Sequence, residues 1–81
     1  MTKSQAKKNL KAAVLNFRKI EAAHNRIVAG MPDSRFRNAA QRAEANSDEQ
    51  ARERAWSALQ NARAAALAVL DYSEVAAIAG R

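Results

Sequence analysis

Residues 3–29, KSQAKKNLKAAVLNFRKIEAAHNRIVA, decide the fold of this chain. Apolar side chains recur in this segment at intervals of three and four residues, which is the spacing of one face of an α-helix. The residues of that face are Ala6, Leu10, Ala13, Phe17, Ile20, His24, Ile27 and Val28. The spacing continues long enough to resemble the seam of a coiled coil. We therefore predict a helix over about residues 3–29 that packs against another helix.

The same segment carries the whole net charge of the protein. It holds seven basic side chains and one acid, which gives +6, the net charge of the full chain. The basic residues lie on the arc of the helix opposite the apolar face, with Leu15 as the one large apolar residue among them. They are Lys3, Lys7, Lys8, Lys11, Arg18, Lys19 and Arg26, and we name them the basic arc. This arc is a candidate binding face for anionic partners, and its alternative role is a solvated exterior.

The strongest break in the pattern follows directly, at residues 30–33. Gly30 can adopt the left-handed conformation that ends many helices, and Pro32 cannot continue the preceding helix. Asp33 or Ser34 can then cap a new helix by accepting hydrogen bonds from its free amides. We expect this short second helix to cover about residues 34–45.

A weaker break is predicted at Asn46–Ser47. Ser47 and Gln50 fit a capping box, which favours a third helix over about residues 48–79. The alternative is that no break exists and that one helix runs over residues 34–79, because the surrounding residues are strong helix formers. The apolar face of the last helix is predicted to contain Ala55, Trp56, Leu59, Ala62, Ala66, Val69 and Leu70.

Residues 1–81 therefore form a single all-α domain, either an antiparallel helical hairpin or a three-helix arrangement. The hydrophobic fraction of 48% overstates the core, because alanine provides more than half of it. Such a thin core is commonly completed by a second copy, so we expect a homodimeric bundle. The chain has no cysteine and no apolar run long enough to span a bilayer. We accordingly expect a cytoplasmic protein without a membrane span.

The residues that could carry chemistry are few. Glu21 and His24 form the Glu-x-x-His half of a carboxylate-bridged di-metal site, but no further acid falls on a predicted apolar face. His24 is better explained as a histidine at the edge of the core, either hydrogen-bonded or half exposed. The sequence contains no catalytic triad, glycine-rich phosphate loop or paired carboxylates in a cleft. We expect neither an enzyme nor a bound cofactor or metal.

Five further residues are candidate anchors for a protein interface. Large apolar side chains and arginine outside the core are typical of such anchors. Arg63 falls within the apolar arc, so it either reaches solvent along neighbouring side chains, pairs with Glu21, or joins Trp56 on a binding surface. Val75 and Ile78 point away from the main apolar stripe and either fray or form a second contact surface. The complete set is Phe36, Trp56, Arg63, Val75 and Ile78.

Two functions from different classes agree with this pattern. The first is a non-catalytic helical module that binds another protein stoichiometrically, as an inhibitor, adaptor or antiactivator. Small stand-alone helical chains of this kind are frequent among phage and mobile-element accessory proteins. That statement concerns the class of small helical proteins and does not rest on particular residues of this sequence. The second is a nucleic-acid-binding protein that places the basic arc on the phosphate backbone. No aromatic residue lies among the basic ones to stack on bases, which favours the first.

Overall fold

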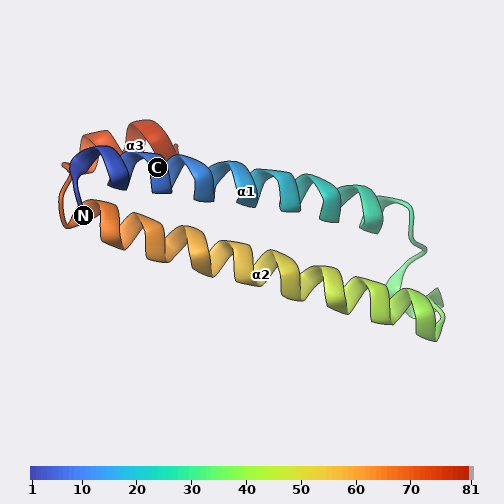
Figure 1. Ribbon diagram of the computed structural model, residues 1–81. Coiled ribbons are helices and arrows are strands. Elements are labelled where there is room, and N and C mark those ends of the chain that lie inside the picture. The colour runs from blue at the N-terminus through green and yellow to red at the C-terminus, as the bar shows by residue number, and fades with distance from the viewer. Residues whose placement is uncertain (81) are drawn as a thin grey trace.

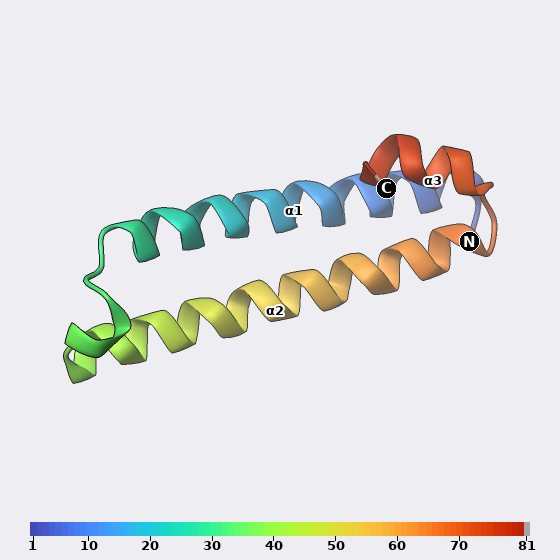
Figure 2. The same ribbon diagram turned by 180° about the vertical axis from the view of Figure 1, so that it is seen from behind.

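A computed structural model describes residues 1–80, with Ser34 by its backbone alone, and shows three α-helices in this part of the chain. Helix α1 spans Lys3–Ala29, α2 spans Ala39–Leu67 and α3 spans Tyr72–Ala79. Helices α1 and α2 lie antiparallel, and α3 returns along the N-terminal half of α1 (Figure 1). Seen from behind, α3 crosses in front of α1 (Figure 2). The predicted all-α architecture with a long helix 1 is confirmed.

Helix α1 begins where the sequence predicts it. Thr2 and Gln5 form a capping box, in which the N–H of Gln5 donates to Oγ1 of Thr2 and the N–H of Thr2 donates to Oε1 of Gln5, both at 3.1 Å. Helix α1 ends before Gly30, as predicted, but Gly30 does not use the left-handed conformation that is open to glycine, since its φ of −84° is right-handed. Its N–H still donates to the carbonyls of Arg26 and Ile27, so the last turn of α1 is closed without a left-handed residue.

The second long helix begins later than predicted. A single 3₁₀ turn, η1, occupies Ser34–Phe36, and Asp33 caps it by accepting from the N–H of Arg35 at 3.1 Å. Helix α2 starts only after Asn38, because Asn38 and Gln41 form a second capping box with bonds of 2.8 and 3.0 Å. The predicted helix start at residue 34 is therefore wrong.

The predicted break at Asn46–Ser47 is also wrong, because α2 continues through both residues. The alternative of one helix over residues 34–79 is wrong as well, since α2 ends at Leu67 and the chain turns back into α3. The turn is favoured because it buries Leu70 and Val75, which keep 5% and 1% of their surface exposed. The short helix of this protein is thus its third, not its second.

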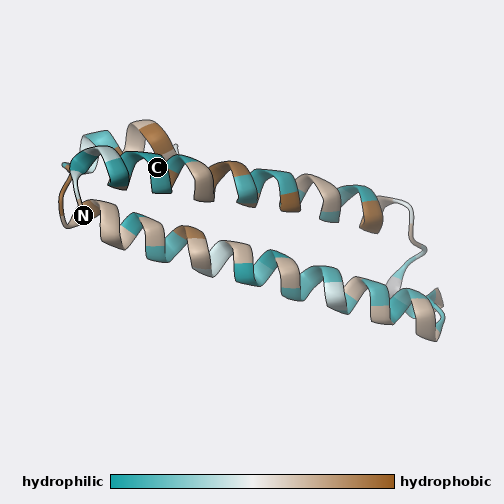
Figure 3. Ribbon diagram, in the orientation of Figure 1, coloured by the Kyte–Doolittle hydropathy of each residue, from teal (hydrophilic) through white to brown (hydrophobic). Residues whose placement is uncertain are grey.

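The hydrophobic core lies at one end of the hairpin, where the three helices meet. Its buried members are Ala6, Leu10, Val14, Leu59, Ala66, Leu70 and Val75. Figure 3 shows the most hydrophobic residues on α1 and α3, whereas α2 is mostly pale or hydrophilic. The other end of the hairpin is only two helices thick.

The described part of the chain is consequently elongated. It measures 49 × 17 × 15 Å, with a radius of gyration of 16.0 Å, whereas a compact chain of this length would have about 12 Å. None of the helices within residues 1–80 has both the length and the apolar character needed to cross a membrane.

Candidate functional site

The flank of the hairpin that α3 covers continues beyond the end of α3. Leu10 and Val14 pack in the core with Val75 of α3. Phe17 and Glu21 follow them on α1 at intervals of three and four residues, so they lie on the same flank of the helix. The surface on which α3 packs is therefore the beginning of a longer surface.

The short length of α3 leaves most of this flank open. Its 8 residues span about 12 Å, whereas the 27 residues of α1 span about 40 Å. A methyl group on Gly80 would lie 3.9 Å from Nη2 of Arg18, so the end of α3 lies within reach of the Arg18 side chain. From that point toward the α1–α2 loop, the flank is formed by α1 and α2 alone.

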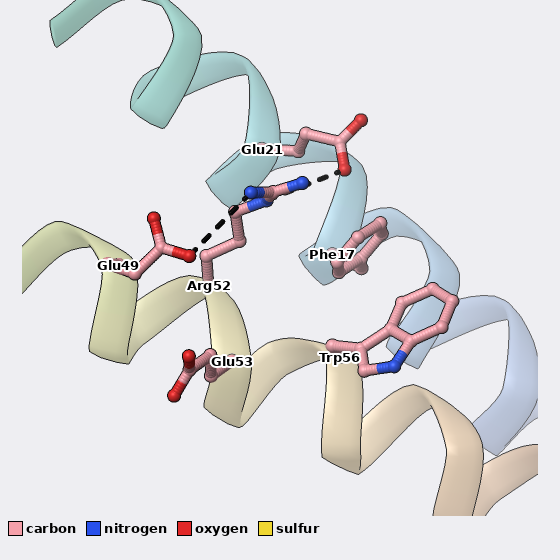
Figure 4. A pocket seen from close by; sticks show the side chains of 6 residues that line it. All are labelled: Phe17, Glu21, Glu49, Arg52, Glu53 and Trp56. Carbon is pink, nitrogen blue, oxygen red and sulfur yellow. Dashed lines mark ion pairs between the residues drawn. The ribbon is translucent and has the colours of Figure 1, made fainter. Parts of the chain in front are cut away.

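A pocket of about 340 Å³ lies on this open stretch. The rings of Phe17 on α1 and Trp56 on α2 contact each other in its wall, with centroids 5.3 Å apart and planes at 55° (Figure 4). Trp56 keeps 49% of its surface exposed, although the sequence places it on the apolar face of its helix. We name the pocket the aromatic groove and define it by its lining residues Phe17, Glu21, Glu49, Arg52, Glu53 and Trp56.

The aromatic groove is negatively charged. Three carboxylates and one guanidinium line it, so its formal charge is −3 + 1 = −2. Arg52 lies between Glu21 and Glu49, with a nitrogen-to-oxygen distance of 3.9 Å to each (Figure 4). At such distances the guanidinium neutralises the carboxylates only in part. A protein of net charge +6 thus carries an acidic site with aromatic walls.

A buried polar pair lies next to the groove in the α1–α2 interface. Nδ1 of His24 is hydrogen-bonded to Oδ2 of Asp48, and Oε2 of Glu49 is 3.8 Å from Nε2 of the same ring. Of the two states predicted for His24, the structure shows the hydrogen-bonded one, and the sequence did not identify Asp48 as its partner. Within the described residues, no three His, Asp or Glu side chains are arranged to hold a metal ion.

The basic arc lies on the exposed side of α1, as the sequence predicts. Its members Lys3, Lys7, Lys8, Lys11, Arg18, Lys19 and Arg26 are all exposed. Lys7 is engaged in the fold, because its Nζ is 3.3 Å from Oε2 of Glu74 on α3. Leu15 lies among the basic residues with 65% of its surface exposed. The arc and the aromatic groove are therefore separate surfaces of opposite charge.

The five candidate anchors do not form one surface. Phe36 is 72% exposed in η1, next to the guanidinium of Arg35. Val75 is buried in the core and Ile78 is half-buried against it, because the turn after α2 directs both toward α1. Neither is therefore a free anchor in this fold.

Arg63 is half-buried on α2, and the ion pair of Glu21 is made with Arg52 rather than with Arg63. Of the five candidate anchors, only Trp56 lies in the groove.

The sequence contained a signal for the groove that the prediction did not use. This signal is the spacing of three or four residues that relates Glu49 to Arg52 and Glu53, and relates these two in turn to Trp56. Such spacing puts all four residues on one flank of a continuous helix. The predicted break at residues 46–47 made the first of them look like helix-start residues.

No family model, curated protein or solved structure matches this chain.

Proposed function

We propose that this protein is a small non-catalytic helical module that acts by stoichiometric binding to another protein, as an inhibitor, adaptor or antiactivator. The observation that supports this most is the aromatic groove, an open pocket with a half-exposed tryptophan on a flank that continues from the core. Tryptophan and arginine are the residues most enriched at the energetic centres of protein interfaces, and the groove holds both.

The scaffold also suits such a role. The two walls of the groove are long helices held together by the α3 end of the hairpin, so the site is formed before a partner arrives. A preformed site loses less conformational entropy on binding than a flexible one. An exposed apolar surface on a small protein is also a common sign of a binding site.

The test is capture followed by titration. The tagged full chain is used to isolate a protein from the source cells, and the purified partner is then titrated by calorimetry. We expect saturable binding with a fixed stoichiometry and a loss of affinity of at least about tenfold in Trp56→Ala, because truncating an interface tryptophan commonly costs more than about 1.4 kcal/mol.

The matched control is the pair of changes Lys8→Gln and Lys19→Gln, which alters the basic arc and leaves the groove intact. The control is expected to bind as the unchanged protein does. The proposal is wrong if the partner binds Trp56→Ala with full affinity.

A second candidate is binding to a nucleic-acid backbone, and the exposed basic arc is the observation that favours it. Such binding weakens steeply as salt rises, because the protein displaces counterions from the phosphates. Titration of duplex DNA and of single-stranded RNA at 50 and 200 mM salt decides this. Undetectable binding at the lower salt removes the candidate. We also propose that the chain forms the homodimer that its thin core predicts.

A further inference from the structure

We infer that the aromatic groove receives a basic amphipathic helix of the partner protein, which continues the path of α3 and completes a three-helix bundle along the hairpin. This inference rests on the proposed function, because it requires a protein partner. It goes further by stating what the partner presents, namely a helix with an apolar stripe flanked by lysine or arginine.

The fold itself shows that this flank accepts a helix. Helix α3 packs on its first part through Val75 and Ile78, and the Lys7–Glu74 ion pair joins the helices at the edge. Because the same flank continues past Arg18, a second helix can pack there in the same manner. The remaining part of α1, residues 19–29, is about 16 Å long, which corresponds to three turns of helix.

The aromatic walls of the groove determine which side chains the apolar stripe of the partner's helix should carry. Phe17 and Trp56 offer two ring surfaces, and Trp56 keeps 49% of its surface exposed in the absence of a partner. A leucine, isoleucine or methionine packed against the exposed side of this ring pair would bury part of that area, and each buried side chain of this size contributes about 1.5–3 kcal/mol. Helix-in-groove recognition commonly depends on a few such side chains at positions i, i+3, i+4 and i+7.

The negative charge of the groove favours lysine or arginine on both sides of the apolar stripe of the partner's helix. Glu21 and Glu49 share one guanidinium at 3.9 Å, so the three carboxylates of the groove retain capacity for further donors. A lysine or arginine at the edge of the ligand helix would reach these carboxylates, and its cation would also lie near the face of the Trp56 ring. An acidic helix would add negative charge to a site whose formal charge is already −2.

The same charge argues against a second copy of this chain in the groove. Two grooves placed face to face would bring two sites of −2 together. The basic helix of the chain is α1, but its apolar face is already buried against α2, and only Leu15 remains exposed within its basic arc. A helix from a different protein therefore fits the groove better.

The experiment uses Trp56 as its reporter, because it is the single tryptophan of the chain. The full chain is titrated with a 14-residue helical peptide that carries leucine at intervals of three and four residues and lysine elsewhere. A matched peptide has glutamate in place of every lysine. Titrations are done at 150 mM salt, where the Debye length of about 8 Å screens the net positive charge of the protein.

We expect a saturable change of Trp56 fluorescence with the lysine peptide and none with the glutamate peptide. The double variant Glu49→Gln and Glu53→Gln brings the groove to a formal charge of zero and is expected to weaken binding about tenfold. The double variant Lys8→Gln and Lys19→Gln, on the basic arc, is the control and is expected to bind the peptide unchanged. Circular dichroism confirms that each variant is folded.

Three results would overturn the inference. The first is equal or tighter binding of the glutamate peptide, and the second is unchanged affinity in the Glu49→Gln, Glu53→Gln variant. The third is a shift of Trp56 fluorescence with protein concentration alone, which would mean that a second copy covers the groove. The proposed function is tested separately, because a captured partner that needs Trp56 but presents no basic helix would retain the function and remove only this inference.

Discussion

His24 on α1 is hydrogen-bonded to Asp48 on α2 across the interface of the two long helices. The two side chains are only 11% and 12% exposed, so a polar pair replaces one apolar layer of the hairpin. Displacing one helix against the other by a single turn would separate the two groups. The pair therefore favours one register of α1 against α2, and that register also sets Phe17 opposite Trp56.

Removing one partner of this pair is expected to destabilise the fold. Asp48→Ala leaves His24 nearly buried without its partner, which lowers the free energy of unfolding by about 1–3 kcal/mol. Urea denaturation followed by circular dichroism measures this value. Glu44→Ala, an exposed change on the same helix, is the control and should stay within about 0.5 kcal/mol.

A joint replacement of the pair separates the cost of leaving one polar group without its partner from the contribution of the intact pair to stability. His24→Leu with Asp48→Leu is expected to recover most of the lost stability, because apolar residues often replace a buried polar pair at little cost. A single Asp48→Ala change that costs no more than Glu44→Ala would show that the pair does not support the fold.

At the three-helix end of the hairpin, the same leucine-to-alanine change is expected to have different effects on stability at a buried and at an exposed position. Leu10 is fully buried among α1, α2 and α3, so Leu10→Ala is expected to lower the free energy of unfolding by about 2–5 kcal/mol. Leu15→Ala makes the same chemical change at a position that is 65% exposed, and it should have a small effect. Similar melting curves for the two variants would contradict the position of α3 over Leu10.

The sequence predicted α1 well, because its apolar periodicity and its Thr2 cap are local and agree with each other. It failed at both ends of α2 and at the predicted break inside this helix, where local signals and tertiary contacts disagree. Ser47 and Gln50 suggest a cap, but a continuous helix brings Asp48 to His24, and this long-range contact decides the outcome. Residues 64–70 favour helix throughout, and yet the chain turns shortly after Leu67.

The turn after Leu67 depends on packing between residues that are far apart in the sequence, which a local sequence pattern does not predict. Val75 and Ile78 would point away from α1 if α2 continued as a straight helix, and the turn allows both to pack on the core. The Asp71–Glu74 spacing is the one local sign of a new helix start, since the N–H of Asp71 donates to Oε1 of Glu74 at 3.4 Å. The aromatic groove was missed for a different reason, because the predicted break at residues 46–47 made Glu49 look like a residue of a helix start.

We predict that the packing of α3 on α1 becomes less stable at acidic pH, because it is supported by the ionised carboxylate of Glu74. Its hydrogen bond with the N–H of Asp71, and then its contact with the Lys7 ammonium, hold the pKa of Glu74 below its ordinary value of 4.5. A lowered pKa means that the folded state favours the ionised form. The stabilisation is thus complete above the ordinary pKa and is lost as the pH falls through the lowered value.

Hydrogen exchange of the α3 amides checks this dependence. Glu74→Gln should speed exchange in α3 at pH 7 and have no effect once the pH is well below the pKa of Glu74. Lys7→Gln should have a smaller effect at pH 7, because it leaves the bond to Asp71 in place. An equal effect of Glu74→Gln at neutral and acidic pH would contradict the role of its charge.

We propose that the expected homodimer forms through the flank of the hairpin opposite α3. Helical register places Ile20 and Ile27 on that flank, and both are half-buried in the single chain. A face of 49 × 17 Å can supply about the 800 Å² per partner that a standard interface needs. Two copies packed through this flank would add a second helical layer to the thin end of the hairpin and leave the aromatic groove open.

Light scattering coupled to size exclusion should accordingly give a mass of twice the 8.8 kDa of one chain. Ile20→Arg places a charge in the dimer face and is expected to give the mass of one chain, because an unpaired charge is costly to bury. Trp56→Ala changes the groove instead and should leave the mass at two chains. A dimer that is lost in Trp56→Ala but kept in Ile20→Arg would place the second copy in the groove, and a single-chain mass for the unchanged protein would remove the dimer altogether.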